Sequence, residues 1–248
     1  MRDVLRSAVA AVGFLTVVPI GRQAEVGDGD RLRTGSVLFP VIGAAVGALT
    51  GLIAWAAAFV LPPFPSAVLG VGAGVLITGA LHLDGLADTA DGIGASLAGG
   101  DPSAVMHDPR LGVFGGTALL LDLSLRIGVL NALVAGPRFP AEAIAAGALG
   151  RAVAIALLAT TPYAGGGTGA WTREVGVARG LIAATVTAAI GLAAVGPVFG
   201  AITIAAATAS ALIRRWSRRR LGGMTGDTLG AAAELSETLG LTVALALG

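Results

Sequence analysis

The sequence has no cysteine, no lysine and few charges of either sign. Charged residues make up 12% of its 248 residues, whereas hydrophobic residues make up 55%. The absence of cysteine excludes a secreted disulfide scaffold. A soluble domain is about one quarter charged, so this chain has too little charge to cover a soluble globule, to form a disordered tail or to bind nucleic acid. The remaining class is a polytopic membrane protein, surrounded by a lipid bilayer.

Seven apolar stretches reach the roughly 20 residues that a membrane-spanning helix needs. Prolines separate several of them, because proline lacks an N–H group and clashes with the preceding helical turn. No polar domain or Gly/Ser-rich linker interrupts the chain, so we predict one all-α domain over residues 1–248, a polytopic helical bundle of about seven transmembrane helices. The predicted spans are Gly35–Leu61, Ser66–Leu83, Gly112–Ala135, Ala141–Thr161, Arg179–Gly196, Pro197–Ile213 and Leu229–Gly248.

A shorter apolar stretch, Ser7–Ile20, precedes these spans. Arg2 and Arg6 before it imitate a signal peptide, but no clear small-residue cleavage site follows it. The stretch is too short to cross a bilayer as a helix. We therefore predict an N-terminal interfacial or half-inserted helix that ends at Pro19.

The arginines predict which way the bundle faces. With the N-terminus in the cytoplasm, seven spans place thirteen of the sixteen arginines on the cytoplasmic side, including the cluster Arg214–Arg220. Only Arg138 falls on the other side, while Arg126 and Arg151 lie inside spans. This asymmetry is the positive-inside signal. The same rule favours a topological role and lipid-headgroup contacts for Arg214–Arg220 over a catalytic role.

Two patterns predict how the spans pack. Glycines at G-x-x-x-G spacing within residues 43–51 and 70–74 allow close approach of neighbouring helices, which needs no ligand. Asp122 and Arg126 are four residues apart and predict an ion pair on one helix. Arg151 has no nearby partner in the sequence, so we expect it to point into the bundle.

Three acids follow the second predicted span. Asp84, Asp88 and Asp91 are spaced i, i+4 and i+7, which places them within about 60° of one helical face. Carboxylates stacked in this way repel one another unless a cation lies between them. Oxygen ligands favour Mg²⁺, with Mn²⁺ as the alternative, over Zn²⁺. A solvated acidic helix end and a proton or cation pathway are the other interpretations of these acids.

Other polar residues are expected on the same face of the membrane. His82 stands alone, and a lone histidine more often serves packing or hydrogen bonding than direct chemistry. Asp108 is a candidate to complete a metal shell, and Arg110 a candidate to pair with phosphate oxygens. The alternative for both is a turn, because Asp-Pro commonly initiates one.

The segment 222–230 opens the last span. Glycine lets a backbone approach a ligand, and a helix N-terminus suits a phosphate, so Gly223 and Thr225 are candidate phosphate-binding residues. Asp227 and Glu234 are seven residues apart and share one helical face. Asp227 is explained equally well as a helix N-cap. Together, the three polar segments offer the groups that metal-dependent phosphoryl or nucleotidyl-phosphate transfer requires.

Two of these segments carry a family resemblance. The run Gly-Ala-Leu-His-Leu-Asp-Gly-Leu-Ala-Asp-Thr-Ala-Asp-Gly at 79–92 resembles the signature of the adenosylcobinamide-GDP ribazoletransferase (cobalamin synthase) family. So does Gly-Gly-Met-Thr-Gly-Asp-Thr-Leu-Gly-Ala at 222–231, followed by Glu234 and Glu237. Shorter matches occur in the family's order, so the resemblance covers nearly the whole chain. They are Phe14-Leu15-Thr16 with Pro19, Phe39–Gly43, Gly150-Arg151-Ala152 and Pro162-Tyr163.

One segment departs from the family pattern. The family's Met-Lys-Asp-Ser-Arg reads Met-His-Asp-Pro-Arg here, so His107 and Pro109 replace the lysine and the serine. Asp108 and Arg110 keep their places. A role for a lysine or a serine hydroxyl at these two positions is therefore in doubt.

The resemblance implies the last joining step of cobalamin assembly. Adenosylcobinamide-GDP donates its phosphate-linked cobinamide to α-ribazole or its 5′-phosphate, and GMP leaves. Asp84, Asp88 and Asp91 then hold Mg²⁺, while Asp227 or Glu234 deprotonates the attacking hydroxyl, with His82 and water as the other candidates for the base. The resemblance also implies a multi-pass protein of the bacterial cell (inner) membrane whose active site faces the cytoplasm, and leaves open whether it is a homo-oligomer.

Three alternatives stay open on the sequence. CDP-alcohol phosphatidyltransferases also use a helical Asp-rich motif, but their pattern has Ala-Arg where this chain has Ala87 followed by Asp88. A cation-coupled transporter uses intramembrane acids as an ion path. A scaffold for other enzymes of the pathway needs no metal-dependent chemistry.

Overall fold

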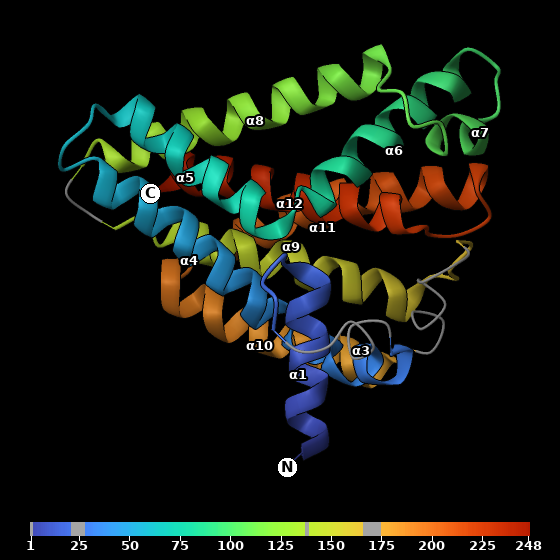
Figure 1. Cartoon of the computed structure of the whole chain (residues 1–248), viewed down its shortest axis with the longest axis horizontal. Coiled ribbons are helices and arrows are strands. Elements are labelled where there is room, and N and C mark those ends of the chain that lie inside the picture. The colour runs from blue at the N-terminus through green and yellow to red at the C-terminus, as the bar shows by residue number, and fades with distance from the viewer. Residues whose placement is uncertain (1, 21–27, 137–138, 166–174) are drawn as a thin grey trace.

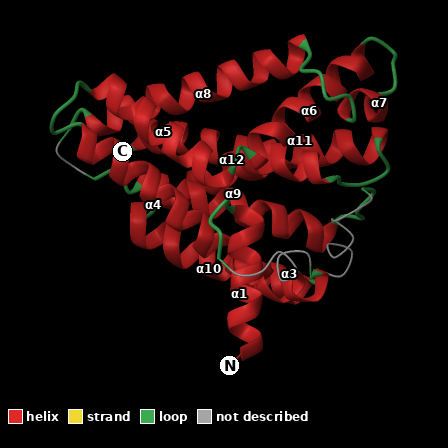
Figure 2. Ribbon diagram, viewed as in Figure 1, coloured by secondary structure: helices red, strands yellow, loops and turns green. Residues whose placement is uncertain are grey.

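The computed structural model describes residues 2–20, 28–136, 139–165 and 175–248, and all extended regular elements in these ranges are helices (Figures 1 and 2). Six of them are long and apolar enough to cross a membrane, or seven if the bent pair α5 and α6 counts as one span. The predicted all-α bundle of about seven spans is confirmed. In chain order the helices are α1 (Arg2–Leu15), α3 (Gly29–Gly35), the 3₁₀ helix η1 (Ser36–Leu38), α4 (Phe39–Ala57), α5 (Pro63–Thr78), α6 (Leu81–Leu97), α7 (Pro102–Met106), α8 (Val113–Val134), α9 (Glu142–Thr160), α10 (Val177–Val195), α11 (Val198–Arg220) and α12 (Gly226–Leu247).

The second predicted span, Ser66–Leu83, is wrong at its end. α5 stops at Thr78, and α6 starts three residues later at an angle of 89° to it. Gly79 and Ala80 make the break with φ of 59° and 58°, in the left-handed region. The N–H of Ala80 donates to the carbonyl of Val75 at 3.0 Å, which closes α5 by the usual left-handed C-terminal motif. The acidic motif therefore lies on a helix of its own.

The N-terminal helix is shifted from its prediction. α1 runs from Arg2 to Leu15 instead of over Ser7–Ile20, so it ends before Pro19. The hydroxyl of Thr16 donates to the carbonyl of Val12 at 2.7 Å just beyond the helix end. In Figure 1, α1 is drawn nearly upright, whereas α8, α11 and α12 run across the picture. Its interfacial placement stays a prediction.

The arginine cluster is helical rather than a loop. The predicted span Pro197–Ile213 continues as α11 to Arg220, so Arg214–Arg220 form its last two turns. Cations are favourable at this end of a helix, because the exposed carbonyl groups there carry partial negative charge. The first predicted span, Gly35–Leu61, is displaced toward the N-terminus, since α3, η1 and α4 run on as one candidate span from Gly29 to Ala57.

Glycines bring α4 and α9 into backbone contact, as their spacing predicts. A Cβ atom at Gly43 would collide with the carbonyl of Gly147, and one at Gly47 with the carbonyl of Ala143. On the other side of α4, a Cβ at Gly70 of α5 would lie 2.6 Å from the carbonyl oxygen of Thr50. Such contacts are open only to glycine, so the G-x-x-x-G pattern here serves helix packing.

A buried ion network joins α8, α9 and α12. Arg126 contacts Asp122 on its own helix at 3.6 Å (Nε–Oδ2), Glu234 at 3.0 Å (Nη1–Oε1) and Glu237 at 2.8 Å (Nη2–Oε1). Arg151 of α9 also pairs with Glu237. The predicted Asp122–Arg126 pair and the inward direction of Arg151 are both confirmed. The network ties the middle of α12 to two neighbouring helices.

Candidate functional site

A cavity of about 730 Å³ lies where α1, the start of α4, α6, α7, α9, α11 and α12 approach one another. Its polar lining includes Asp84, His107, Arg151, Arg220 and Asp227. Its apolar lining includes Phe14, Leu15, Phe39, Leu81, Leu158 and Leu221. The cavity therefore offers two carboxylates and two guanidinium groups beside an aromatic and aliphatic wall.

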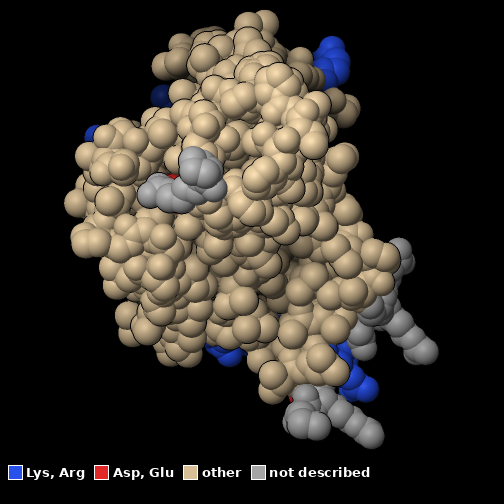
Figure 3. Space-filling model, turned by 90° about the vertical axis from the view of Figure 1, so that its left-hand side faces the viewer, with Lys and Arg blue, Asp and Glu red and all other residues tan. Residues whose placement is uncertain are grey.

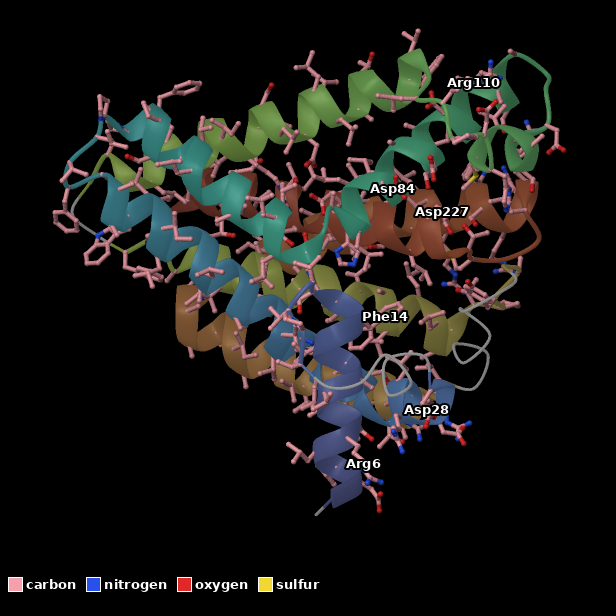
Figure 4. All side chains as sticks on the ribbon, viewed as in Figure 1. Arg6, Phe14, Asp28, Asp84, Arg110 and Asp227 are labelled. Carbon is pink, nitrogen blue, oxygen red and sulfur yellow. The ribbon has the colours of Figure 1, made fainter. Side chains whose placement is uncertain are left out.

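Glycines set the spacing of α6 and α12 at this cavity. A Cβ at Gly85 would lie 2.7 Å from the carbonyl oxygen of Asp227, and one at Gly230 would lie 3.5 Å from the Cα of Gly85. Because neither residue has a side chain, the two helices cross closely and bring Asp84 and Asp227 to the same cavity. Figure 4 shows these two acids between the crossing helices.

The acids at this crossing repel one another. Asp88 is repelled by Asp84, Asp227 and Asp91, and is attracted by His107. Asp227 is likewise repelled by Asp84 and attracted by His107. Asp84 is exposed, while Asp88 and Asp227 are half-buried. Among the described residues, no three acid or histidine side chains already converge as a metal site.

Asp91 has a different environment from the other two acids of its motif. Its carboxylate accepts hydrogen bonds from the N–H groups of Gly112 and Gly115, both at 2.8 Å. These amides belong to the first turn of α8, where backbone donors lack helical partners. A Cβ at either glycine would collide with the Asp91 carboxylate. Asp91 therefore fastens the start of α8 to α6.

The N-terminus of α12 is capped by Thr225. Its hydroxyl accepts from the N–H of Thr228 at 3.3 Å, and the hydroxyl of Thr228 accepts from the N–H of Thr225 at 2.8 Å. This reciprocal capping box decides one open alternative, because it leaves Asp227 in the first turn without a capping function. Thr225 also lines the cavity, as its predicted role requires.

Gly223 packs against protein backbone. The N–H of Met224 donates to the carbonyl of Pro162, and the N–H of Ala164 donates to the carbonyl of Met224, both at 2.8 Å. A Cβ at Gly223 would collide with the carbonyl of Pro162. This close pairing places Tyr163 beside the cavity, whereas Gly223 itself is not part of the cavity wall.

Asp108 and Arg110 are engaged with each other. The Nη2 of Arg110 lies 2.6 Å from Oδ2 of Asp108, and the backbone N–H of Arg110 donates to Oδ1 at 3.0 Å. The hydrogen bonds from Arg110 lower the pKa of Asp108 to about 2. Neither residue lines the cavity, and Arg110 points away from Asp84 in Figure 4. The turn alternative fits this geometry.

His82 and Glu234 differ in their access to the cavity. His82 is buried and lines both the large cavity and a second, much smaller one. Glu234 lines only the smaller cavity, where it pairs with Arg126. Of the two carboxylates considered as the base, Asp227 alone lines the large cavity, and it forms no ion pair with another described residue.

Three basic residues of the cavity were absent from the site predicted from the sequence: His107, Arg151 and Arg220. His107 was noted only as a departure from a family pattern, and its Nδ1 lies 2.6 Å from the carbonyl oxygen of Ser103. Arg220 was assigned to the topology cluster. No sequence signal separates Arg220 from its neighbours, because its place at the cavity rim depends on where α11 ends.

Curated proteins named adenosylcobinamide-GDP ribazoletransferase are similar to this chain. The one from Ralstonia nicotianae is 37% identical over 99% of this chain and 97% of its own length. The one from Leptothrix cholodnii is 36% identical over 92% of this chain and 90% of its own length. The one from Klebsiella pneumoniae is 35% identical over 97% of this chain and 100% of its own length. No solved structure shows a significant match.

The match extends to the whole family. The model of the cobalamin-5-phosphate synthase family matches residues 7–245, which include every segment that builds the cavity. These comparisons do not favour a CDP-alcohol phosphatidyltransferase, a transporter or a scaffold. The chain belongs to the cobalamin-5-phosphate synthase family.

Proposed function

We propose that the protein is an adenosylcobinamide-GDP ribazoletransferase. It transfers the phospho-cobinamide group of adenosylcobinamide-GDP to α-ribazole or its 5′-phosphate. A ribazole hydroxyl oxygen forms a bond to the cobinamide-bearing phosphorus, the bond from this phosphorus to the bridging oxygen breaks, and GMP leaves. The observation that carries the proposal is the meeting of Asp84 and Asp227 from two family-signature segments at one cavity.

Asp227 is the proposed general base. It stands in the first turn of α12, is not used as a cap and faces the cavity. In this role its carboxylate accepts the proton of the attacking hydroxyl as the new P–O bond forms. Arg220 contacts a nonbridging phosphate oxygen, since guanidinium groups bind phosphate through paired hydrogen bonds. It takes the place expected of Arg110, while the buried Arg151, paired with Glu237, contributes positive charge at the cavity wall.

The apolar wall accommodates the base of ribazole. Phe14 and Phe39 stack with ring centroids 5.9 Å apart and both line the cavity, together with Leu158. A flat aromatic benzimidazole gains free energy by leaving water for such a wall. With the base on this wall, the part of the cavity lined by Asp84 and Asp227 is left for the ribose hydroxyls.

A divalent cation fits the donor chemistry of this site. Asp84 and Asp88 supply only oxygen ligands, and they repel each other and the nearby Asp227, which a hard cation such as Mg²⁺ or Mn²⁺ held by Asp84 and Asp88 would relieve. When bound, the ion supplies positive charge that offsets the charge developing on the departing GMP. Asp91, predicted from the sequence as a ligand, has both oxygens engaged by amides, so we assign it a positioning role.

The cavity is proposed to face the cytoplasm of a bacterial cell. It lies beside the end of α11 that carries Arg214–Arg220, and a basic membrane face is typically cytoplasmic. The face formed by the left-hand end of Figure 1 is almost free of charged side chains in Figure 3, the uncertain residues aside. This contrast supports the orientation.

The test is release of GMP from adenosylcobinamide-GDP by the purified protein in detergent, with and without α-ribazole. We expect release that requires α-ribazole and is matched by formation of the joined corrinoid. Chelation by EDTA should abolish it, and Mg²⁺ should restore it. GMP release without α-ribazole would indicate hydrolysis and contradict the proposal, and undiminished transfer in EDTA would contradict the metal assignment.

A further inference from the structure

The end of α11 carries a groove lined by arginines. Arg214, Arg215, Arg218 and Arg219, with Ala211, line a hollow of about 510 Å³. The four arginines are spaced i, i+1, i+4 and i+5, so they share one side of the helix over two turns. None of the four lines the large cavity.

These arginines lack the carboxylate partners that others in the chain have. In the described structure, no Asp or Glu forms an ion pair with any of the four. The five described arginines between residues 30 and 151 all have such a partner: Arg31, Arg33, Arg110, Arg126 and Arg151. In a chain with only fifteen acids, four neighbouring unpaired guanidinium groups leave a local positive charge for an external anion.

One of these side chains is already held in place. The Nη2 of Arg214 donates to the carbonyl of Thr160 at 3.1 Å, at the last residue of α9. Its Nε is buried, with no hydrogen-bond partner among the described residues. Arg214 also lines the groove, where its guanidinium group can meet an anion. The anchored guanidinium gives the groove a fixed element that a flexible basic tail lacks.

The surface above the groove is apolar. Ile204 and Leu212 of α11 are 70% and 64% exposed. Ile204, Ala211 and Arg215 lie within about 20° of one direction around the helix, and Leu212 within about 80°. An apolar stripe therefore leads along a membrane-spanning helix into the arginine groove. This arrangement suits acyl chains continuous with a charged headgroup, whereas a free nucleotide would use only the arginines.

We propose that this groove is a binding site for the phosphate headgroup of an anionic phospholipid. The arginines contact the phosphodiester, and the acyl chains lie along Ile204 and Leu212. The site is separate from the transfer cavity and does not depend on the proposed reaction. A soluble phosphate would share the same headgroup chemistry, so the test must separate the two sources.

The experiment measures binding of a fluorescent phosphatidylglycerol to the purified full-length protein in an uncharged detergent. The variant is Arg218→Gln with Arg219→Gln. The matched control is Arg31→Gln with Arg33→Gln, which removes the same charge at a site where each arginine has a carboxylate partner. We expect binding about 30-fold weaker in the variant, from the usual contribution of a basic residue near an anionic headgroup. The control should bind as the wild type does.

Competition of three unlabelled molecules with the fluorescent probe tests the proposal further. Phosphatidylcholine should compete weakly, and glycerol 3-phosphate or GMP at millimolar concentration should not displace the probe. If the variant and the control lose the same binding affinity for the probe, only bulk charge attraction is at work, and the proposal is overturned. Efficient displacement of the probe by a soluble phosphate would show a site for soluble anions and would also overturn it. Arg215→Gln alone repeats the test if the double variant is not monodisperse, and undiminished binding by it would also contradict the assignment.

Discussion

The carboxylate of Asp91 on α6 accepts a hydrogen bond from the N–H of Gly112, 21 residues later, at 2.8 Å. Asp84, on the same helix, makes no side-chain hydrogen bond with any described residue. The two acids of one motif should therefore respond differently to removal. Asp91→Ala should destabilise the protein by about 2 kcal/mol, since it leaves helix-end amides of α8 without their acceptor.

Asp84→Ala tests the other half of this contrast. We expect its unfolding free energy to stay within about 0.5 kcal/mol of the wild type, as for most exposed positions. Its transfer rate should nevertheless fall strongly, because Asp84 faces the cavity. Thermal unfolding in detergent and GMP release measure the two properties on the same samples. A destabilised Asp84→Ala, or a fully stable Asp91→Ala, would reverse the assigned roles.

The helix crossing gives a matched pair of glycine variants. A Cβ at Gly85 would lie 2.7 Å from the Asp227 carbonyl, whereas one at Gly230 has no neighbour nearer than 3.5 Å. Gly85→Ala should push α12 away and lower transfer activity at least tenfold, a typical cost of misplacing a catalytic group by about 1 Å. Gly230→Ala should keep most of the activity. Equal activities would mean that the crossing does not position Asp227.

Substitutions of Arg220 and Arg110 should differ in their effect on KM. Arg220→Ala should raise KM for adenosylcobinamide-GDP about 10- to 100-fold, the cost of one lost charge-assisted hydrogen bond. Arg110→Ala should barely change it, because Arg110 is 87% exposed and already paired with Asp108. A larger rise in KM for Arg110→Ala than for Arg220→Ala would instead assign the phosphate contact to Arg110.

The Asp108–Arg110 pair also leads to a prediction for the pH dependence of the transfer rate. Hydrogen bonds from Arg110 lower the pKa of Asp108 from 3.8 to about 2. A lowered pKa means that the pair is fully formed above pH 4 and is lost only as the pH falls through about 2. Any change in transfer rate between pH 7 and pH 5 must therefore come from other groups. Arg110→Ala should leave the pH profile in this range unchanged; a shifted profile would show that the pair takes part.

The buried network should contribute to stability more than any surface pair. Arg126 contacts Asp122, Glu234 and Glu237, and its side chain is 12% exposed. Arg126→Met should destabilise the protein by about 3 to 5 kcal/mol, because it leaves three carboxylates buried with one remaining cation, Arg151. A comparison of unfolding temperatures in detergent with Arg33→Met checks this. A loss no greater than that of Arg33→Met would show that the network is not structural.

The spans and the acidic motif could be predicted from the sequence, because both depend on local patterns. Apolar length gives the spans, and i, i+4, i+7 spacing gives the shared face of Asp84, Asp88 and Asp91. The break before α6 could not, because Ala80 is a good helix former that here adopts a positive φ. Gly79 and Ala80 end α5 by the local left-handed motif, and the close crossing of α6 and α12 at Gly85 and Gly230 holds α6 in its new direction.

The different roles of the acids within the site could not be predicted from the sequence either. Asp91 and Asp84 look alike in the motif, but Asp91 meets backbone amides that belong to a later helix. Glu234 and Asp227 share one face of α12, but Glu234 meets Arg126, 108 positions earlier in the chain. Such partners depend on tertiary contacts, which spacing within one helix does not contain.

The most direct test is α-ribazole-dependent GMP release by the wild type, Asp227→Asn and Thr228→Ala under saturating substrates with Mg²⁺. Thr228 belongs to the capping box of the helix that carries Asp227 and does not line the cavity, so its variant controls for a loosened α12. We predict that Asp227→Asn lowers kcat by about 10²- to 10⁴-fold at nearly wild-type stability, whereas Thr228→Ala mainly lowers stability. Transfer at the wild-type rate by a folded Asp227→Asn protein would contradict a reaction centred on the crossing of α6 and α12.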